Sequence, residues 1–256
     1  MSANETPLVE MRGMVKHYGT IRAVENVDLD IGRSEVLAIV GDNGAGKSTL
    51  VKALCGAIRP DSGEVRLDGE LRAFHNPREA RRAGISVVYQ DLALVEGRDV
   101  SHNIFLGELP RRAFIVNKRL MDRESRKTVA AISINAPNVR TRVSQLSGGQ
   151  RQAVAIARAV HEGGRLMFLD EPTAALGVQE SAHVLKVMVD LKESRGMSLV
   201  VVSHNLEHVF SIADRIAVMR GGRLVGVRRR DETSPKEIVE LITGAAAIAA
   251  AGNGAG

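Results

Sequence analysis

The order of apolar segments along this chain of 256 residues predicts an α/β fold with a parallel sheet. An uninterrupted apolar run of strand length occurs at 36–40, and strands are also expected at 165–169 and 198–202, where four apolar residues follow Arg165 and Ser198, with segments of helical spacing between them. Strands that are apolar throughout are typical of parallel sheets with helices on both faces. A glycine-rich turn after the first of these runs also fits a strand that leads directly into a helix.

The remaining elements follow from shorter patterns. Segments 8–16 and 27–31 alternate apolar and polar residues, which predicts two half-buried antiparallel strands with a turn near Gly19. Further strands are expected at 64–67 and 85–89. A helix is expected to follow the glycine-rich turn and to end near Ala57. A last helix is expected from Ser234 to about Ile242, where Ser234, Pro235 and Glu237 form a capping-box pattern. Between them, helices are expected at 77–83, near 101–107, near 122–132, from 147 through 159 and at 178–195.

Length and composition fit a single sizeable domain or two small ones. We expect one domain over 8–243, with a helical subdomain inserted at about 91–160 and flexible tails at 1–7 and 244–256. The net charge of +5 comes from 35 basic and 30 acidic residues spread along the chain, and aromatic residues are few, so no nucleic-acid partner is expected.

The single cysteine, Cys55, lies among apolar neighbours and is expected to be buried. One cysteine cannot form an internal disulfide, which fits a reducing, cytoplasmic setting. The sequence contains neither a signal peptide pattern nor an apolar run of the ~18–20 residues needed to span a bilayer. A role at a membrane would therefore require another chain to span it.

The segment Gly-Asp-Asn-Gly-Ala-Gly-Lys-Ser-Thr at 41–49 fits the phosphate-binding loop pattern G-x-x-x-x-G-K-[ST]. Its glycines allow backbone N–H groups to surround phosphate oxygens, Lys47 can reach the β- and γ-phosphates, and the Ser48 hydroxyl can bind Mg²⁺. A glycine-rich turn without a ligand is the structural alternative, and the strand before and helix after it favour a nucleotide site. The residues expected to hold the nucleotide here are Gly41, Asn43, Gly44, Ala45, Gly46, Lys47, Ser48 and Thr49.

Two adjacent carboxylates, Asp170 and Glu171, end the apolar strand at 165–169. Neighbouring residues of a strand point to opposite faces, so the two acids are expected to have different roles. Asp170 suits the Mg²⁺ shell through a water, and Glu171 can polarise an attacking water as a general base. Two solvated acids at the start of a loop are the alternative.

The segment Leu146-Ser147-Gly148-Gly149-Gln150 begins a helix that runs through 153–159. Ser147 can cap this helix, and Gly148 and Gly149 can leave its first N–H groups open to an anion. In isolation the segment could be a simple helix cap.

With these motifs in this order, the sequence resembles the nucleotide-binding subunits of ATP-binding cassette (ABC) transporters, over 8 to about 244. The pentapeptide at 146–150 is identical to the family's signature motif. The resemblance implies the ABC ATPase fold, in which a RecA-like parallel-sheet core carries an N-terminal antiparallel β subdomain and an inserted helical subdomain. It also implies MgATP as the bound nucleotide and ATP hydrolysis as the activity.

Three further residues take their roles from the resemblance. Tyr18 lies where the family stacks an aromatic ring on adenine, Gln90 lies at the Q-loop, which senses Mg²⁺ and the attacking water, and His204 lies at the switch histidine, which bonds the γ-phosphate. As isolated residues these would be a surface aromatic, a polar strand end and a turn histidine. One departure is Gly177, where most members have the aspartate of the D-loop, so coupling between the two ATP sites of a dimer is in doubt.

The resemblance also implies partners. The family forms head-to-tail dimers, in which Ser147 to Gln150 of one subunit close on ATP bound by Lys47 of the other. The segments 89–94, 103–107 and 171–177 look like the branch that imports monosaccharides such as ribose, xylose and fructose. This implies a homodimer, transmembrane permease subunits, a periplasmic sugar-binding protein that acts through the permease, and a location on the cytoplasmic face of the inner membrane.

Other functions stay open at this point. The chain could import a solute other than a sugar, and another cassette could replace one copy in the dimer. A soluble ATPase of the same superfamily could act on DNA or the ribosome, but DNA-acting members carry long coiled-coil or zinc insertions, and translation factors carry two cassettes. A non-catalytic binding module is disfavoured by the joint presence of Lys47, Asp170, Glu171 and His204.

Overall fold

The computed structural model describes residues 6–112, 115–132 and 138–245. They divide into two compact units, one of which contains the described residues up to Ala80 and from Ser198 onward, and the other Arg81–Met197. The expected flexible tails fall mainly on residues 1–5 and 246–256, which lie outside the described residues. No helix among the described residues has both the length and the apolar character required to cross a membrane.

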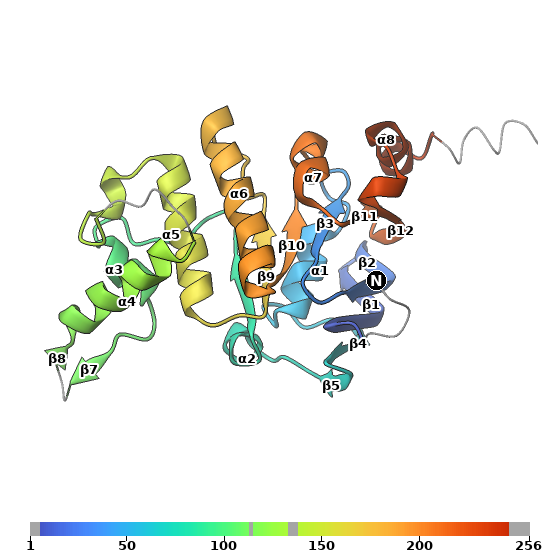
Figure 1. Ribbon diagram of the computed structural model, residues 1–256. Coiled ribbons are helices and arrows are strands. Elements are labelled where there is room, and N and C mark those ends of the chain that lie inside the picture. Colours follow the sequence, from blue (N-terminus) through green and yellow to red (C-terminus); the bar gives the residue numbers. More distant parts are fainter. Residues whose placement is uncertain (1–5, 113–114, 133–137, 246–256) are drawn as a thin grey trace, which may run out of the picture. The chain divides into compact units, whose positions relative to one another are not determined.

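The first unit contains an antiparallel sheet in the order β2-β1-β4-β5 (Figure 1). β1 (Val9–Tyr18) and β2 (Ile21–Ile31) form the predicted hairpin, and β4 (Ser62–Leu67) and β5 (Glu70–Arg72) complete the sheet. Val9, Met11 and Met14 of β1 are buried and most of the residues between them are partly exposed, as the alternation in the sequence predicts.

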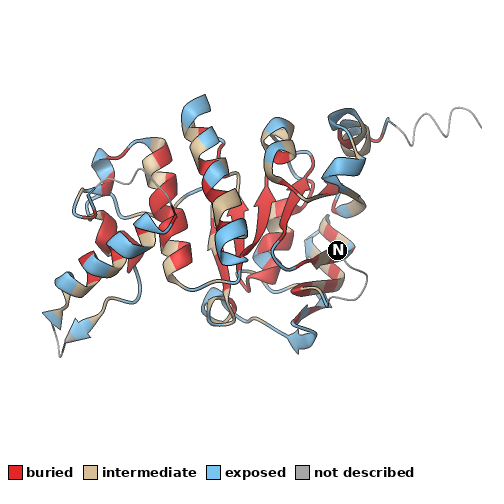
Figure 2. Ribbon diagram, viewed as in Figure 1, coloured by how far each residue is buried: buried red, intermediate tan, exposed pale blue. Residues whose placement is uncertain are grey.

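The other sheet of this unit has the order β12-β11-β3-β10. β3 (Val36–Val40) and β10 (Ser198–Val202) are buried along their whole length (Figure 2) and run parallel to each other, as β3 and β11 (Arg215–Arg220) do. β12 (Arg223–Arg229) is antiparallel to β11. The apolar runs therefore became parallel strands, as predicted.

The helices that lie wholly within the described residues of this unit include α1 (Lys47–Leu54), α7 (Leu206–Ile212) and α8 (Pro235–Thr243). α7 and α8 pack on β3 and β11 through a buried cluster of Ala38, Val40, Val209, Ala213, Ile216, Val218 and Ile238. Cys55 follows α1 and is buried as expected, and its burial raises the pKa of its thiol. Ser234 caps α8 through the N–H of Glu237, but the Glu237 carboxylate accepts from Arg228 and Thr233, so the predicted capping box is replaced by these side-chain contacts.

The second unit contains the parallel pair β6 (Ile85–Val88) and β9 (Leu166–Asp170) and several helices. α5 (Gly148–His161) packs against α3 (Val100–Ile104), α4 (Lys118–Ala130), α6 (Val178–Arg195) and β6. Its buried residues include four alanines, Ala153, Ala155, Ala157 and Ala159, whose small side chains allow neighbouring elements to approach closely.

A few elements differ from the prediction. α3 ends at Ile104 instead of near 107, and Gly107 has φ +96°. α4 begins four residues earlier than 122, because the Asn117 side chain caps it at the N–H of Leu120. The small hairpin of β7 (Arg111–Arg112) and β8 (Ile115–Val116), helix α7 and the strands β5, β11 and β12 had no counterpart in the prediction. α2 (Pro77–Arg82) and the 3₁₀ turns Val143–Gln145 and Arg230–Glu232 complete the described elements.

Candidate active site

The phosphate loop joins β3 to α1 in the first unit, and two of its glycines fit positions that no other residue could occupy without strain. Gly41 has φ +148°, and a Cβ there would lie 2.1 Å from the carbonyl oxygen of Met219. Gly46 has φ +97°, and its Cβ would lie 2.1 Å from the carbonyl oxygen of Ala23. The loop is therefore held between β2 and β11 in a conformation that requires glycine at both ends.

Lys47 is buried at 7% exposure, and its ammonium lies against the loop. Its Nζ donates to the carbonyl oxygens of Gly41 (2.7 Å) and Asp42 (2.9 Å), which holds the charge inside the curve of the backbone. Gly46 stands at the N-cap of α1 and has no side chain to cap it, and the first turn contains no acidic residue. The positive end of the helix dipole is thus not neutralised by an acid of its own first turn, which suits phosphate binding.

The other residues expected in the loop share this location. Asn43 and Gly44 are exposed at its tip, Ala45 is buried, and Ser48 and Thr49 are half-buried in the first turn of α1. The Ala45 N–H donates to the carbonyl of Asp42, which closes a tight turn. The local structure predicted for 36–54 is confirmed.

His204 lies at the same edge of the sheet as the phosphate loop. β3 and β10 are parallel neighbours, with Val202 opposite Ile39, so the segments that follow them leave the sheet side by side. The N–H of Ser203 donates to the carbonyl of Ile39 at 3.3 Å, and the next residue, His204, is exposed. Neighbouring parallel strands therefore bring the histidine and the phosphate loop to one edge.

Tyr18 ends β1 and is 47% exposed. Lys16 lies with its Nζ 5.6 Å from the centroid of the Tyr18 ring. The ring is thus an exposed aromatic surface in the same unit as the phosphate loop, as a base-stacking role requires.

In the second unit, the parallel pair β6 and β9 brings Gln90, Asp170 and Glu171 to one edge. Val88 lies opposite Leu169, Gln90 follows two residues after β6, and Asp170 is the last residue of β9. Glu171 has φ +50°, in the left-handed region that non-glycine residues rarely adopt. The expectation that strand alternation separates the two acids does not apply, because β9 ends at Asp170 and the chain direction changes at Glu171.

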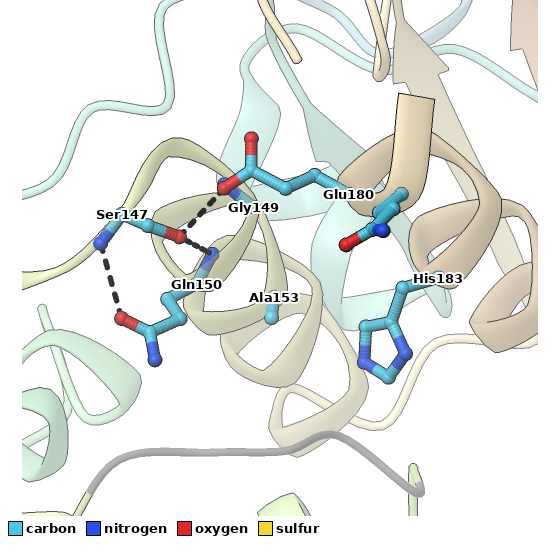
Figure 3. A pocket seen from close by; sticks show the side chains of 7 residues that line it. Ser147, Gly149, Gln150, Ala153, Glu180 and His183 are labelled. Atoms are coloured by element: carbon cyan, nitrogen blue, oxygen red, sulfur yellow. Dashed lines mark hydrogen bonds between the residues drawn. The ribbon is translucent and has the colours of Figure 1, made fainter. Parts of the chain in front are cut away.

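Ser147 caps α5 as predicted. The Gln150 N–H donates to Ser147 Oγ at 3.4 Å and the Ser147 N–H donates to Gln150 Oε1 at 3.0 Å, which completes a capping box (Figure 3). Gly148 and Gly149 leave room for the first turn of α6, since a Cβ on Gly149 would lie 3.0 Å from Glu180 Cβ. The glycines of this segment therefore have a packing role that the sequence alone did not indicate.

The Gly149 N–H, which the sequence predicts to lie open to an anion, donates instead to a carboxylate of the same chain. The Glu180 carboxylate accepts from Ser147 Oγ at 2.8 Å and from the Gly149 N–H at 3.3 Å through the same oxygen. Hydrogen bonds from Ser147, Gly149 and Gly177 lower the pKa of Glu180 below its usual range. Sequence reasoning missed Glu180, and the available signal was an acid at the third position of a helix that begins after Gly177.

The donor set suits Mg²⁺ better than a metal held entirely by the protein. Among the described residues, no group of three or more His, Cys, Asp or Glu side chains could hold a metal ion. Mg²⁺ usually binds through one or two protein oxygens together with phosphates and water. In the first unit, Ser48 in the first turn of α1 offers a hydroxyl of this kind. In the second unit, Asp170 at the end of β9 offers a carboxylate.

Comparison with known proteins agrees with these motifs. The sequence model of the family described as ABC transporter matches residues 24–174, more than half of the chain. The fructose import ATP-binding protein FrcA of Rhizobium meliloti is 43% identical over 249 residues, which cover 94% of this chain and 95% of that protein. The xylose/arabinose import ATP-binding protein XylG of Sulfolobus acidocaldarius is 40% identical and covers 92% of this chain and 94% of its own length.

A longer relative, the ribose import ATP-binding protein RbsA 1 of Rubrobacter xylanophilus, is 41% identical over 93% of this chain but only 47% of its own length. Among solved structures, a nucleotide-free ATP-binding cassette from an ABC transporter superimposes with a TM-score of 0.82 at 23% identity, covering 92% of this chain and 98% of that one. A dimeric ATP-binding cassette bound to ADP and Pi superimposes with a TM-score of 0.74 at 25% identity, covering 87% and 98%. The chain has the ABC ATPase fold and belongs to the ABC transporter family, as one of its ATP-hydrolysing cassettes.

Proposed function

We propose that this protein is the ATP-hydrolysing subunit of a monosaccharide importer, which couples hydrolysis to uptake through a separate permease. The observation that carries the proposal is the full-length similarity, at 43% and 40% identity, to cassettes named for import of fructose and of xylose or arabinose. The geometry of the phosphate loop, which needs glycine at both ends and holds a buried lysine, supports the ATP-binding part.

In this proposal the loop at 41–49 binds the phosphates through its N–H groups, and Lys47 moves its ammonium from the loop carbonyls to the β- and γ-phosphates. Tyr18 stacks on adenine, because its ring is exposed and purine faces bind aromatic surfaces. His204 donates to the γ-phosphate from the edge that it shares with the loop. These contacts bind and orient the nucleotide.

Glu171 acts as the general base that polarises the attacking water, assisted by Gln90. The unusual backbone of Glu171 fits this role, because strained conformations persist where the surrounding structure holds a functional side chain in place. Ser48 and Asp170 would hold Mg²⁺, with Gln90 near it, and the ion neutralises charge on the phosphates when it is bound. The Glu171 carboxylate accepts the proton from the attacking water.

We further infer that two copies associate head to tail, with Ser147, Gly148, Gly149 and Gln150 of one copy against the nucleotide held by the other. A solved cassette that is 25% identical to this chain is dimeric, which supports association of two copies. Association and release then drive permease subunits, with a periplasmic sugar-binding protein delivering the solute on the other side. This places the protein at the cytoplasmic face of the membrane. ATP can drive association of the two copies only if its affinity for the associated state differs from its affinity for the separated state.

Sugar uptake by cells that lack the gene tests the proposal. We expect uptake of at least one labelled monosaccharide among fructose, xylose, arabinose and ribose to fall, and a plasmid with the wild-type gene to restore it. A plasmid encoding Glu171→Gln should not restore uptake although the protein is made at the same level, because the base is lost and the shape kept. Unchanged uptake of all four sugars would refute sugar import.

The same cells distinguish the alternatives. Defective uptake of another solute would retain the ATPase and transport function but change the substrate. A soluble ATPase would be supported instead by two results together. Cells that lack the gene would take up sugars normally, and DNA or ribosomes would stimulate ATP hydrolysis by the purified protein.

A further inference from the structure

The start of α5, which carries the signature segment, already holds an anion supplied by the chain itself. Glu180, the third residue of α6, places one carboxylate oxygen 2.8 Å from Ser147 Oγ and 3.3 Å from the Gly149 nitrogen (Figure 3). Both atoms donate to that oxygen. These are a hydroxyl and an N–H at a helix N-terminus, the groups that a phosphate oxygen also accepts from.

The contact is supported from both helices. The other Glu180 oxygen accepts from the Gly177 N–H at 3.4 Å, so the carboxylate connects the first turns of α5 and α6. The absence of a Cβ on Gly149 allows this approach, because such an atom would lie 3.0 Å from Glu180 Cβ. The three hydrogen bonds lower the pKa of Glu180, so the group is ionised at neutral pH.

Space for a second position of the carboxylate lies beside the first. A pocket of about 310 Å³ opens between α5 and α6 and is lined by Ser147, Gly149, Gln150, Ala153, Gln179, Glu180 and His183. His183 Nε2 is buried and makes no hydrogen bond within the described part of the chain. Since residues three apart on a helix are neighbours, a carboxylate that leaves Ser147 has a polar atom of its own helix nearby.

We propose that Glu180 is a positioning residue that occupies the phosphate-binding donors of the signature segment, and that the γ-phosphate bound by the partner subunit must displace its carboxylate when the dimer closes. The proposal rests on the head-to-tail dimer of the proposed function. Two anions cannot share the same two donors, because like charges at contact distance repel strongly outside bulk water. Glu180 therefore stabilises the open state and raises the ATP concentration at which the dimer forms.

The test uses the full-length Glu171→Gln protein, in which ATP persists, and follows dimer formation by light scattering as MgATP is added. We expect the additional change Glu180→Gln to lower the ATP concentration for half-maximal dimerisation by roughly threefold to tenfold, the range of a partly exposed charge-assisted contact. Glu180→Ala should lower it as well. In the protein with Glu171 intact, Glu180→Gln should lower KM for ATP with little change in kcat.

A matched control removes the same charge elsewhere on α6. Glu193 lies exposed near the C-terminal end of that helix, and Glu193→Gln should leave the midpoint unchanged. If Glu180 only caps α6, Glu180→Gln and Glu180→Ala will lower the melting temperature without lowering the ATP concentration for half-maximal dimerisation. An ATP concentration equal to or higher than that of the Glu171→Gln parent overturns the proposal. Failure of the Glu171→Gln parent to dimerise at any ATP concentration would instead count against the head-to-tail dimer itself.

Discussion

Lys47 is the residue whose charge the phosphate loop is built to hold. Two backbone carbonyls, those of Gly41 and Asp42, accept from its ammonium at 2.7 and 2.9 Å. The carbonyls compensate part of the cost of burying the charge. A phosphate that enters the loop gains a charge-assisted contact, which is the strong kind of hydrogen bond.

Loss of this charge should weaken nucleotide binding selectively. We expect Lys47→Ala to raise the Kd for MgATP by roughly tenfold to a hundredfold, since a hydrogen bond to a charged group contributes about 1.5–3 kcal/mol. Lys52→Ala is the matched control, because Lys52 is exposed in the last turn of the same helix. Calorimetric titration measures both. Equal Kd values for wild type and Lys47→Ala would contradict the role of the lysine.

The sequence predicts where some site residues lie, but not their backbone conformation or their contacts with distant residues. The positions of Gly41, Lys47 and Ser147 follow from motifs. The structure places Gly41 directly after β3, Lys47 at the first position of α1 and Ser147 at the N-cap of α5. The positive φ of Glu171 and the reach of Glu180 to Ser147 do not follow from any local pattern. The first depends on where β9 ends. The second depends on the packing of two helices whose first residues, Gly148 and Val178, are thirty residues apart in the sequence.

Among the elements, α5 links the signature segment to the chain that follows Gln90. Arg158, in its last turn, donates to the carbonyl oxygens of Leu92 at 2.7 Å and Ala93 at 2.9 Å. Burial lowers the pKa of its guanidinium. Ala93 has φ +48°, so this guanidinium stabilises a segment whose backbone is locally strained.

Truncation of Arg158 should therefore destabilise the protein. We expect Arg158→Ala to lower the free energy of unfolding by about 2 kcal/mol, because two carbonyls lose their donors. Arg158→Lys should fall between wild type and alanine, since an ammonium lacks the fork that reaches both carbonyls. Urea unfolding measures the effect, with Arg126→Ala on the exposed face of α4 expected to stay within about 0.5 kcal/mol of wild type. If Arg158→Ala also changes the free energy of unfolding by less than about 0.5 kcal/mol, the hydrogen bonds of Arg158 contribute little to stability.

The elements that the sequence predicted best are those with a strong local signal. β3 is a continuous apolar run, β10 has four apolar residues after Ser198, and the ends of α6 were predicted to the residue. β11 and β12 were missed although they form an antiparallel pair, because arginines begin and end both strands and interrupt the pattern. Their place beside β3 is fixed by pairing with residues far away in the sequence, which no local pattern contains.

At the scale of the whole molecule, the sequence contains one phosphate loop and one signature segment. It matches 95% and 94% of two relatives but 47% of a third, which is about twice as long. In the head-to-tail arrangement that we propose, each nucleotide touches the phosphate loop of one copy and the signature segment of the other. Two identical copies can supply both of these segments.

ATP-dependent association of two copies is the result expected of this molecule. Glu171→Gln keeps the shape of the side chain but removes the base, so MgATP should convert the 27.5 kDa chain to a species of twice that mass in light scattering. Because only ATP carries the γ-phosphate that joins the two copies, ADP should leave the protein monomeric. The double variant Lys47→Ala with Glu171→Gln should stay monomeric with MgATP. A single-copy mass for Glu171→Gln at saturating MgATP would rule out a homodimer formed by nucleotide. A mass of two copies in every condition would show instead that association does not depend on the γ-phosphate.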